Sequence, residues 1–91
     1  MKEETEIKEK IIEIAKEYGV TKLVLFGSAI ESFNSANDID LACDGLYDKR
    51  FFSFGAKLEE VLKKRVDLIP LNPHNSFIEE VLKSGRLIYG V

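Results

Sequence analysis

The chain contains very little of the two residues that most often bind zinc or form covalent cross-links. Its 91 residues include one cysteine and one histidine. The single thiol, Cys43, cannot form a disulfide within the chain, and its apolar setting favours the role of a small core residue. His74 follows Pro73 in a loop with no nucleophilic serine or cysteine context, so we expect a turn residue rather than a catalyst. A zinc site of thiolate and imidazole ligands is therefore disfavoured.

Long apolar runs and excess positive charge are also missing. No apolar stretch approaches the roughly 20 residues needed to cross a bilayer, and the N-terminus, MKEETEIKEK, lacks the apolar segment of a signal peptide. We therefore expect a cytoplasmic protein without a membrane segment. The formal net charge is −3, so no diffuse positive field draws the chain to nucleic acid. This argues against a DNA or RNA partner.

The residues that are present have the composition of an ordinary globular protein. Hydrophobic residues make up 45% of the chain and charged residues 32%, which lies outside the disordered range. A chain of this length has room for one core, and it contains no repeat, low-complexity stretch or linker. We expect a single domain over residues 1–91.

Hydrophobic periodicity predicts alternating helices and strands. Helical spacing of apolar residues indicates helices over 3–18, about 48–64 and 76–84. Short apolar runs indicate strands over 20–26, 38–41, 65–70 and 86–89. This order predicts an α/β (α+β) sandwich with one mixed β-sheet of about four strands and flanking helices.

Three finer expectations follow from the same segments. Ser76 and Glu79 are spaced as a capping box at the start of the third helix. One helical stripe cannot bury all three phenylalanines at 51, 52 and 54, so we expect Phe52 on a partner-facing surface. The basic residues at 63–65 complement the end of the second helix, with contact to a phosphate as the alternative.

Two carboxylates stand close together on the strand that follows Asn37. Residues two apart on a strand point to the same face, which places Asp38 and Asp40 roughly 6–7 Å apart. Asp40 lies between Ile39 and Leu41, where a carboxylate is costly to desolvate unless it is paired or bound to a metal. The alternative is that Asn37-Asp38 is only a turn and strand-entry signal.

A third acid, Asp67, lies in the apolar run Arg65–Pro70. If its strand is adjacent to the Asp38–Asp40 strand, the spacing of about 4.8 Å brings three carboxylates to one end of the sheet. Oxygen ligands favour Mg²⁺ or Mn²⁺.

The pair Gly27-Ser28 ends the first expected strand. Glycine permits a tight turn and close approach of a ligand, and the Ser28 hydroxyl can cap the turn that follows. Free N–H groups at such a point attract anions, so a triphosphate could bind there. By itself the pair is a weak signal, because most such pairs are plain turns.

Together these residues resemble a known family. Gly27-Ser28, nine intervening residues, Asp38-Ile39-Asp40 and the later Asp67 are similar to the signature of the minimal nucleotidyltransferases of the DNA polymerase beta-like superfamily. The chain looks most like the MntA-like antitoxins that pair with HEPN proteins, and the resemblance covers nearly all of it. It departs from the pattern at residues 29–32, where Glu31 replaces a commonly basic residue, and the gap before the paired acids is about one residue shorter.

The resemblance implies an enzyme that transfers AMP, or another nucleoside monophosphate, from ATP to a hydroxyl acceptor. Asp38, Asp40 and Asp67 would be the catalytic and metal-binding residues for two Mg²⁺ ions, with Mn²⁺ as a substitute. Gly27 and Ser28 would bind the nucleotide. The acceptor would be a tyrosine on a HEPN-type helical toxin, which makes the chain an antitoxin. Homodimerisation through exposed phenylalanines would be the other way to complete the site.

Two other functions remain open at this stage. The chain could be a non-catalytic antitoxin or binding module that neutralises its partner by occlusion, and the altered run after Ser28 favours this reading. It could also modify a small molecule, as aminoglycoside-modifying relatives do, which would require a substrate pocket.

Overall fold

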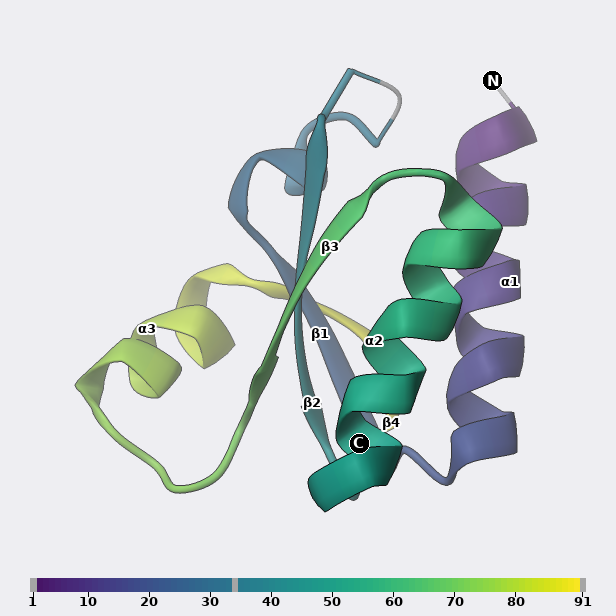
Figure 1. Ribbon diagram of the computed structural model, residues 1–91. Helices are drawn as coiled ribbons and strands as arrows, with labels where there is room; N and C mark the ends of the chain where they lie inside the picture. The colour runs from purple at the N-terminus through teal and green to yellow at the C-terminus, as the bar shows by residue number, and fades with distance from the viewer. Residues whose placement is uncertain (1, 34, 91) are drawn as a thin grey trace.

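A computed structural model describes residues 2–33 and 35–90, and within these residues three α-helices enclose a four-stranded sheet (Figure 1). The elements in chain order are α1 (Lys2–Tyr18), β1 (Lys22–Phe26), the short 3₁₀ turn η1 (Gly27–Ile30), β2 (Asp38–Asp44), α2 (Asp48–Leu62), β3 (Arg65–Pro70), α3 (Ser76–Ser84) and β4 (Arg86–Gly90).

The sheet is mixed, as the order of elements predicts. Its strand order is β3-β2-β1-β4. Strand β1 is antiparallel to both β2 and β4, whereas β2 and β3 are parallel. Parallel neighbours need a crossover connection, and α2 supplies it. The predicted α/β sandwich with one mixed sheet of four strands is therefore confirmed.

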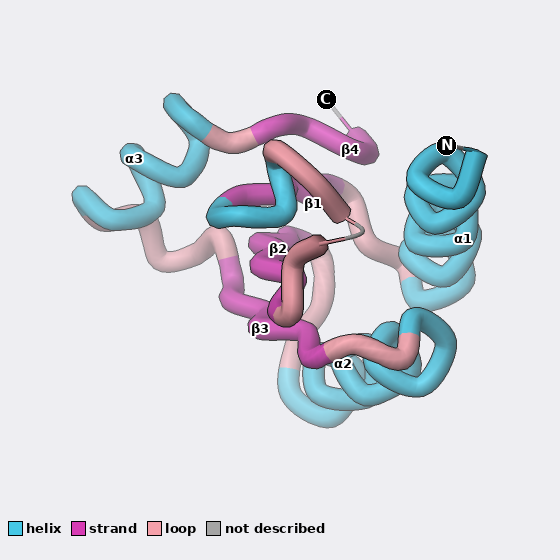
Figure 2. The backbone as a smooth tube through the Cα atoms, turned by 90° about the horizontal axis from the view of Figure 1, so that it is seen from above, coloured by secondary structure: helices cyan, strands magenta, loops and turns pink. Residues whose placement is uncertain are grey.

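Helices cover both faces of this sheet. Helices α1 and α2 lie side by side on one face, and α3 lies on the other (Figures 1 and 2). Side chains alternate along each strand, so successive residues enter different cores. Leu25 and Leu41 join the larger core with Phe54 of α2. Val24 and Ala42 join the smaller core under α3.

Several element ends differ from the sequence-based expectations. The capping box at Ser76 is wrong, because the N-cap of α3 is Asn75, whose side-chain oxygen accepts a hydrogen bond from the Ile78 N–H at 2.8 Å. Asn75 has extended backbone geometry and Ser76 is already helical, so only Asn75 can cap. Helix α2 ends two residues early because Lys63 adopts a left-handed conformation with φ 59°.

The side chains singled out earlier have clear places in the fold. Cys43 lies in the larger core, and burial together with the nearby charge of Asp44 raises the pKa of its thiol to about 12. The thiol is therefore an inert core group. Phe54 is buried whereas 73% of Phe52 is exposed, and whether that ring faces a partner stays a prediction. Over the described residues, no helix has both the length and the apolar character needed to cross a membrane.

Candidate active site

The candidate acids meet in one row across the sheet. Asp40 of β2 pairs with Asp67 of β3 on one side and with Phe26 of β1 on the other. Cross-strand partners project to the same face, which here is the face covered farther along by α3. Asp38 precedes Asp40 by two residues and therefore points to this face as well. The fold thus brings Asp67, which is 27 positions away from Asp40 in sequence, beside the first two acids.

These carboxylates act on one another. Partial burial raises the pKa of Asp40, and so do the negative charge of Asp67, a hydrogen bond shared with the Asp67 carboxyl, and the charge of Asp38. A hydrogen bond between two carboxyls requires a proton on one of them. The fold therefore crowds carboxyl groups that repel one another when they are ionised, and a bound cation would relieve that repulsion.

The side chains do not form a complete metal cage by themselves. Within residues 2–33 and 35–90, no three His, Cys, Asp or Glu side chains are placed to hold one ion as they stand. This arrangement still fits Mg²⁺, because Mg²⁺ keeps several water ligands and is usually bound by one or two carboxylates together with substrate phosphates. Asp40 and Asp67 supply such a pair, and Asp38 lies close enough for its charge to reach Asp40.

The glycine turn after β1 lies directly against Asp40. Gly27 has φ 80°, and a Cβ atom built on it would overlap the Asp40 carboxylate. Only glycine combines this backbone conformation with space for the acid. Sequence spacing indicated a tight turn here but not its contact with Asp40.

Ser28 lies beside this turn, although not as a capping residue. It is already inside η1, where its carbonyl oxygen accepts a hydrogen bond from the Glu31 N–H at 3.2 Å, and the N-cap is Phe26. The expectation that the Ser28 hydroxyl caps the turn is therefore wrong. Ser28 is instead an exposed residue that lines a hollow, together with Asp38.

That hollow has a volume of about 450 Å³, which is within the usual range for small-molecule sites. Its lining consists of Ser28, Glu31, Ser32, Ser35, Ala36, Asn37 and Asp38. The charged members, Glu31 and Asp38, are both acidic. Sequence reasoning missed Ser32, Ser35, Ala36 and Asn37 as part of the hollow, because an irregular segment has no periodicity that shows which side chains turn inward.

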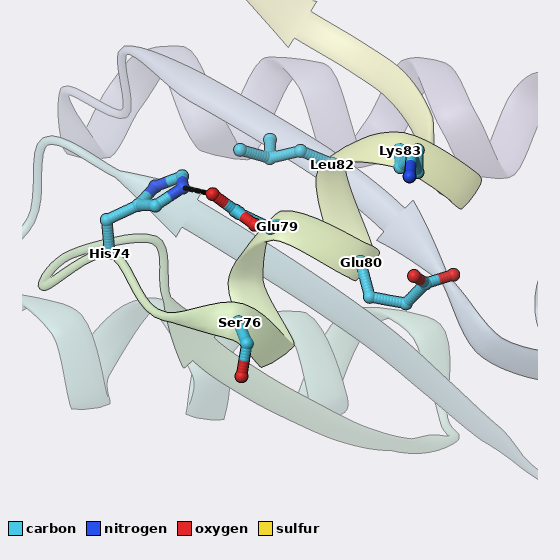
Figure 3. A pocket seen from close by; sticks show the side chains of 6 residues that line it. All are labelled: His74, Ser76, Glu79, Glu80, Leu82 and Lys83. Atoms are coloured by element: carbon cyan, nitrogen blue, oxygen red, sulfur yellow. Dashed lines mark ion pairs between the residues drawn. The ribbon is translucent and has the colours of Figure 1, made fainter.

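A second hollow, of about 380 Å³, lies against α3 and the loop before it and is lined by residues that include His74, Glu79 and Lys83 (Figure 3). The His74 imidazole approaches the Glu79 carboxylate to 3.5 Å, and both side chains are exposed. Ser76 and Glu80 point away from this pair (Figure 3). None of the candidate acids lines this hollow, so it adds nothing to the acid row.

A glycine-serine turn beside a row of acids on neighbouring strands of a small mixed sheet is the arrangement expected of a nucleotidyltransferase. Comparison with known sequences gives the same class: residues 9–91 match the family described as polymerase beta, nucleotidyltransferase. This match covers most of the chain, and the protein belongs to that family. A search of curated proteins finds no match.

Solved structures of similar fold come from toxin–antitoxin complexes. One is an MntA–HepT complex, with 22% identity, a TM-score of 0.75, and coverage of 96% of this chain and 73% of that one. A second is an MNT antitoxin in complex with the tri-AMPylated HEPN toxin of Shewanella oneidensis, with 24% identity, a TM-score of 0.75, and coverage of 96% and 72%. A third is a toxin–antitoxin complex with AMP-PNP, with 25% identity, a TM-score of 0.77, and coverage of 92% and 73%. The resemblance to minimal nucleotidyltransferases is confirmed.

Proposed function

We propose that this protein transfers AMP from ATP, in a Mg²⁺-dependent reaction, to a tyrosine hydroxyl on a helical HEPN-type partner and thereby acts as its antitoxin. The observation that carries the proposal is the contact of Asp40 with Asp67 beneath the Gly27 turn. The tri-AMPylated partner and the bound AMP-PNP in two structures of similar fold support the choice of AMP. We place the reaction in the cytoplasm.

Asp38, Asp40 and Asp67 would hold two Mg²⁺ ions, with Mn²⁺ as a substitute. When bound, such ions neutralise phosphate charge and lower the pKa of an attacking hydroxyl. The fit rests on the oxygen donors of the acid row and on the burial and charge repulsion that together raise the pKa of Asp40.

The chain's own groups have separate tasks in this scheme. Backbone N–H groups at Gly27 and Ser28 bind the outgoing phosphates and align the donor. Asp67, which is exposed, accepts the proton of the acceptor hydroxyl. A bond forms between the acceptor oxygen and the α-phosphorus, the bond from that phosphorus to the bridging oxygen breaks, and pyrophosphate leaves.

The test is incubation of the protein with its purified partner and Mg-ATP, followed by intact-mass measurement of the partner. A mass increase of one or more AMP groups is expected, and Asp38→Ala or Asp40→Ala should abolish it. Asp44→Asn is the matched control, because Asp44 is on the same strand at its other end and its carboxylate accepts from the Gly45 N–H and the Asn72 amide. No mass increase with the wild-type protein would refute the proposal.

A second candidate is a non-catalytic antitoxin that blocks its partner by occlusion. The acidic lining of the hollow beside Asp38 favours it, because Glu31 and Asp38 repel a triphosphate. Neutralisation of the partner that persists in both alanine variants would establish occlusion.

A homodimer formed through the exposed Phe52 would appear as a doubled mass in light scattering that Phe52→Ser restores to the monomer value.

A further inference from the structure

Lys64 joins two parts of the chain that the candidate site needs together. It lies between α2 and β3, three residues before Asp67, and its ammonium group donates a hydrogen bond to the Ala36 carbonyl oxygen at 2.7 Å. The contact is partly buried and spans 28 residues of sequence. Its neighbours Lys63 and Arg65 are exposed, so this contact singles out Lys64 within the basic cluster.

The contact continues the pairing of β2 and β3 beyond the strands themselves. The parallel pairing begins at Asp38 and Arg65. One residue before Arg65, the Lys64 side chain reaches the carbonyl two residues before Asp38. A charge-assisted side-chain bond therefore replaces a ladder bond where the strand pairing stops. It fixes the segment that leads into Asp38 against the segment that leads into Asp67.

Ala36 is also part of the wall of the 450 Å³ hollow. It is buried, so a displaced carbonyl would change the shape of that wall. The charged lining residues, Glu31 and Asp38, are acidic. The bond to the Ala36 carbonyl thus places the positive charge of Lys64 next to a wall whose charged members are acidic.

We propose that Lys64 is a positioning residue for the donor nucleotide, acting by holding residues 35–37 in the shape that accepts the triphosphate. This inference rests on the proposed nucleotidyl transfer and adds a residue to it. Lys64 acts through Ala36 and the wall of the hollow, so its loss weakens donor binding more than it slows the chemical step.

The experiment compares Lys64→Met, Lys64→Arg and Lys63→Met. Lys63→Met is the matched control, because Lys63 is the neighbouring residue, its side chain is exposed, and the variant removes the same charge. Dissociation constants for Mg-AMP-PNP are measured by calorimetry, and KM and kcat are measured for Mg-ATP with the partner as acceptor. Lys64→Met should raise the dissociation constant and KM about tenfold or more, the range expected for a lost hydrogen bond to a charged group. The change in kcat should be smaller.

Lys64→Arg keeps a cationic donor and should recover most of the affinity, whereas Lys63→Met should stay within about twofold of wild type. Amide hydrogen exchange provides a readout that needs neither nucleotide nor partner. Lys64→Met should accelerate exchange in residues 35–38 and leave the central strand β1 protected. Unchanged β1 protection also shows that the variant is folded.

Two failures can be told apart. If wild-type protein binds Mg-AMP-PNP and transfers AMP, but Lys64→Met leaves KM and exchange unchanged, the role of Lys64 is refuted and the transfer reaction stands. An equal effect of Lys63→Met would also refute the role of Lys64, because the loss of any positive charge in this region would then suffice to weaken donor binding. If wild-type protein neither binds nor transfers, the proposed function itself is refuted.

Discussion

Replacing Asp40 with asparagine should stabilise the metal-free protein while it abolishes transfer. In the folded chain, partial burial and the charges of Asp67 and Asp38 raise the pKa of Asp40. Its ionised form is therefore less favourable in the folded state than in the unfolded state. The replacement carries no charge, and its amide group can still donate a hydrogen bond to the Asp67 carboxylate.

The direction of the pH dependence follows from the raised pKa. The folded protein keeps a proton on this carboxyl that the unfolded chain has already lost. The associated stability is fully present below the ordinary aspartate pKa of about 3.9 and is lost as the pH rises through the raised value. Asp40→Asn escapes this loss. Its stability advantage should therefore grow as the pH rises from about 4 and level off once Asp40 of the wild type is ionised.

The size of the effect can be worked from the sheet geometry. Asp40 and Asp67 are direct partners on neighbouring strands, which lie about 4.8 Å apart. Two unit charges about 5 Å apart repel by about 0.8 kcal/mol at the dielectric constant of water and by about 3 kcal/mol at an effective value of 20. Because Asp40 is half-buried and Asp67 exposed, solvent screening favours the lower end. We expect about 1 kcal/mol, equivalent to about 4–8 °C in Tm for a chain of this size.

The assay is thermal unfolding followed by circular dichroism in EDTA between about pH 4 and pH 8. Glu60→Gln is the control, since it removes one carboxylate charge from an exposed position on α2. Added Mg²⁺ should raise the Tm of the wild type more than that of Asp40→Asn. A variant no more stable than wild type at pH 8, or an advantage that does not grow with pH, would refute the proposed repulsion.

Three further substitutions probe the site. Gly27→Ala should reduce transfer at least about a hundredfold, because a Cβ there would overlap the Asp40 carboxylate and alanine disfavours positive φ; unchanged single-turnover rates would contradict this. Glu31→Arg should lower KM for Mg-ATP several-fold by reversing a charge that lines the hollow, and steady-state kinetics at two salt concentrations would show whether the effect is electrostatic. Glu59→Gln should cost about 1 kcal/mol in urea unfolding, because the Glu59 carboxylate accepts the Val66 N–H at 2.9 Å; an unchanged midpoint would show that this bond contributes nothing.

The acid row illustrates what a sequence can reveal about a site. Asp40 stands out because an acid between Ile39 and Leu41 contradicts the hydrophobic pattern of its strand, and strand periodicity then puts Asp38 on the same face. The partnership with Asp67 requires β3 to be parallel to β2 and in one particular register. The number of residues between Asp40 and Asp67 does not reveal that register. It is set by the way α2, which connects β2 to β3, packs on the sheet.

Other features depended on backbone conformations that neighbouring residues could adopt equally well. Asn75 and Ser76 are both good helix caps, and only the extended geometry of Asn75 decides between them. Lys63 ends α2 by adopting positive φ, which a helical apolar pattern does not reveal. The Lys64–Ala36 contact joins an irregular segment to the start of a strand, so no periodic signal could predict it.

Strand β3 is an edge strand of the sheet, so the acids of the proposed reaction centre lie on strands that are not equally well held. Asp38 and Asp40 lie on the interior strand β2, whereas Asp67 lies on β3, which has a strand neighbour on one side only. Edge strands open at lower free energy than interior strands, so a transient opening of β3 would remove Asp67 from the proposed site and stop transfer while the rest of the fold stays intact. Any molecule that clamps this border would then act as an activator.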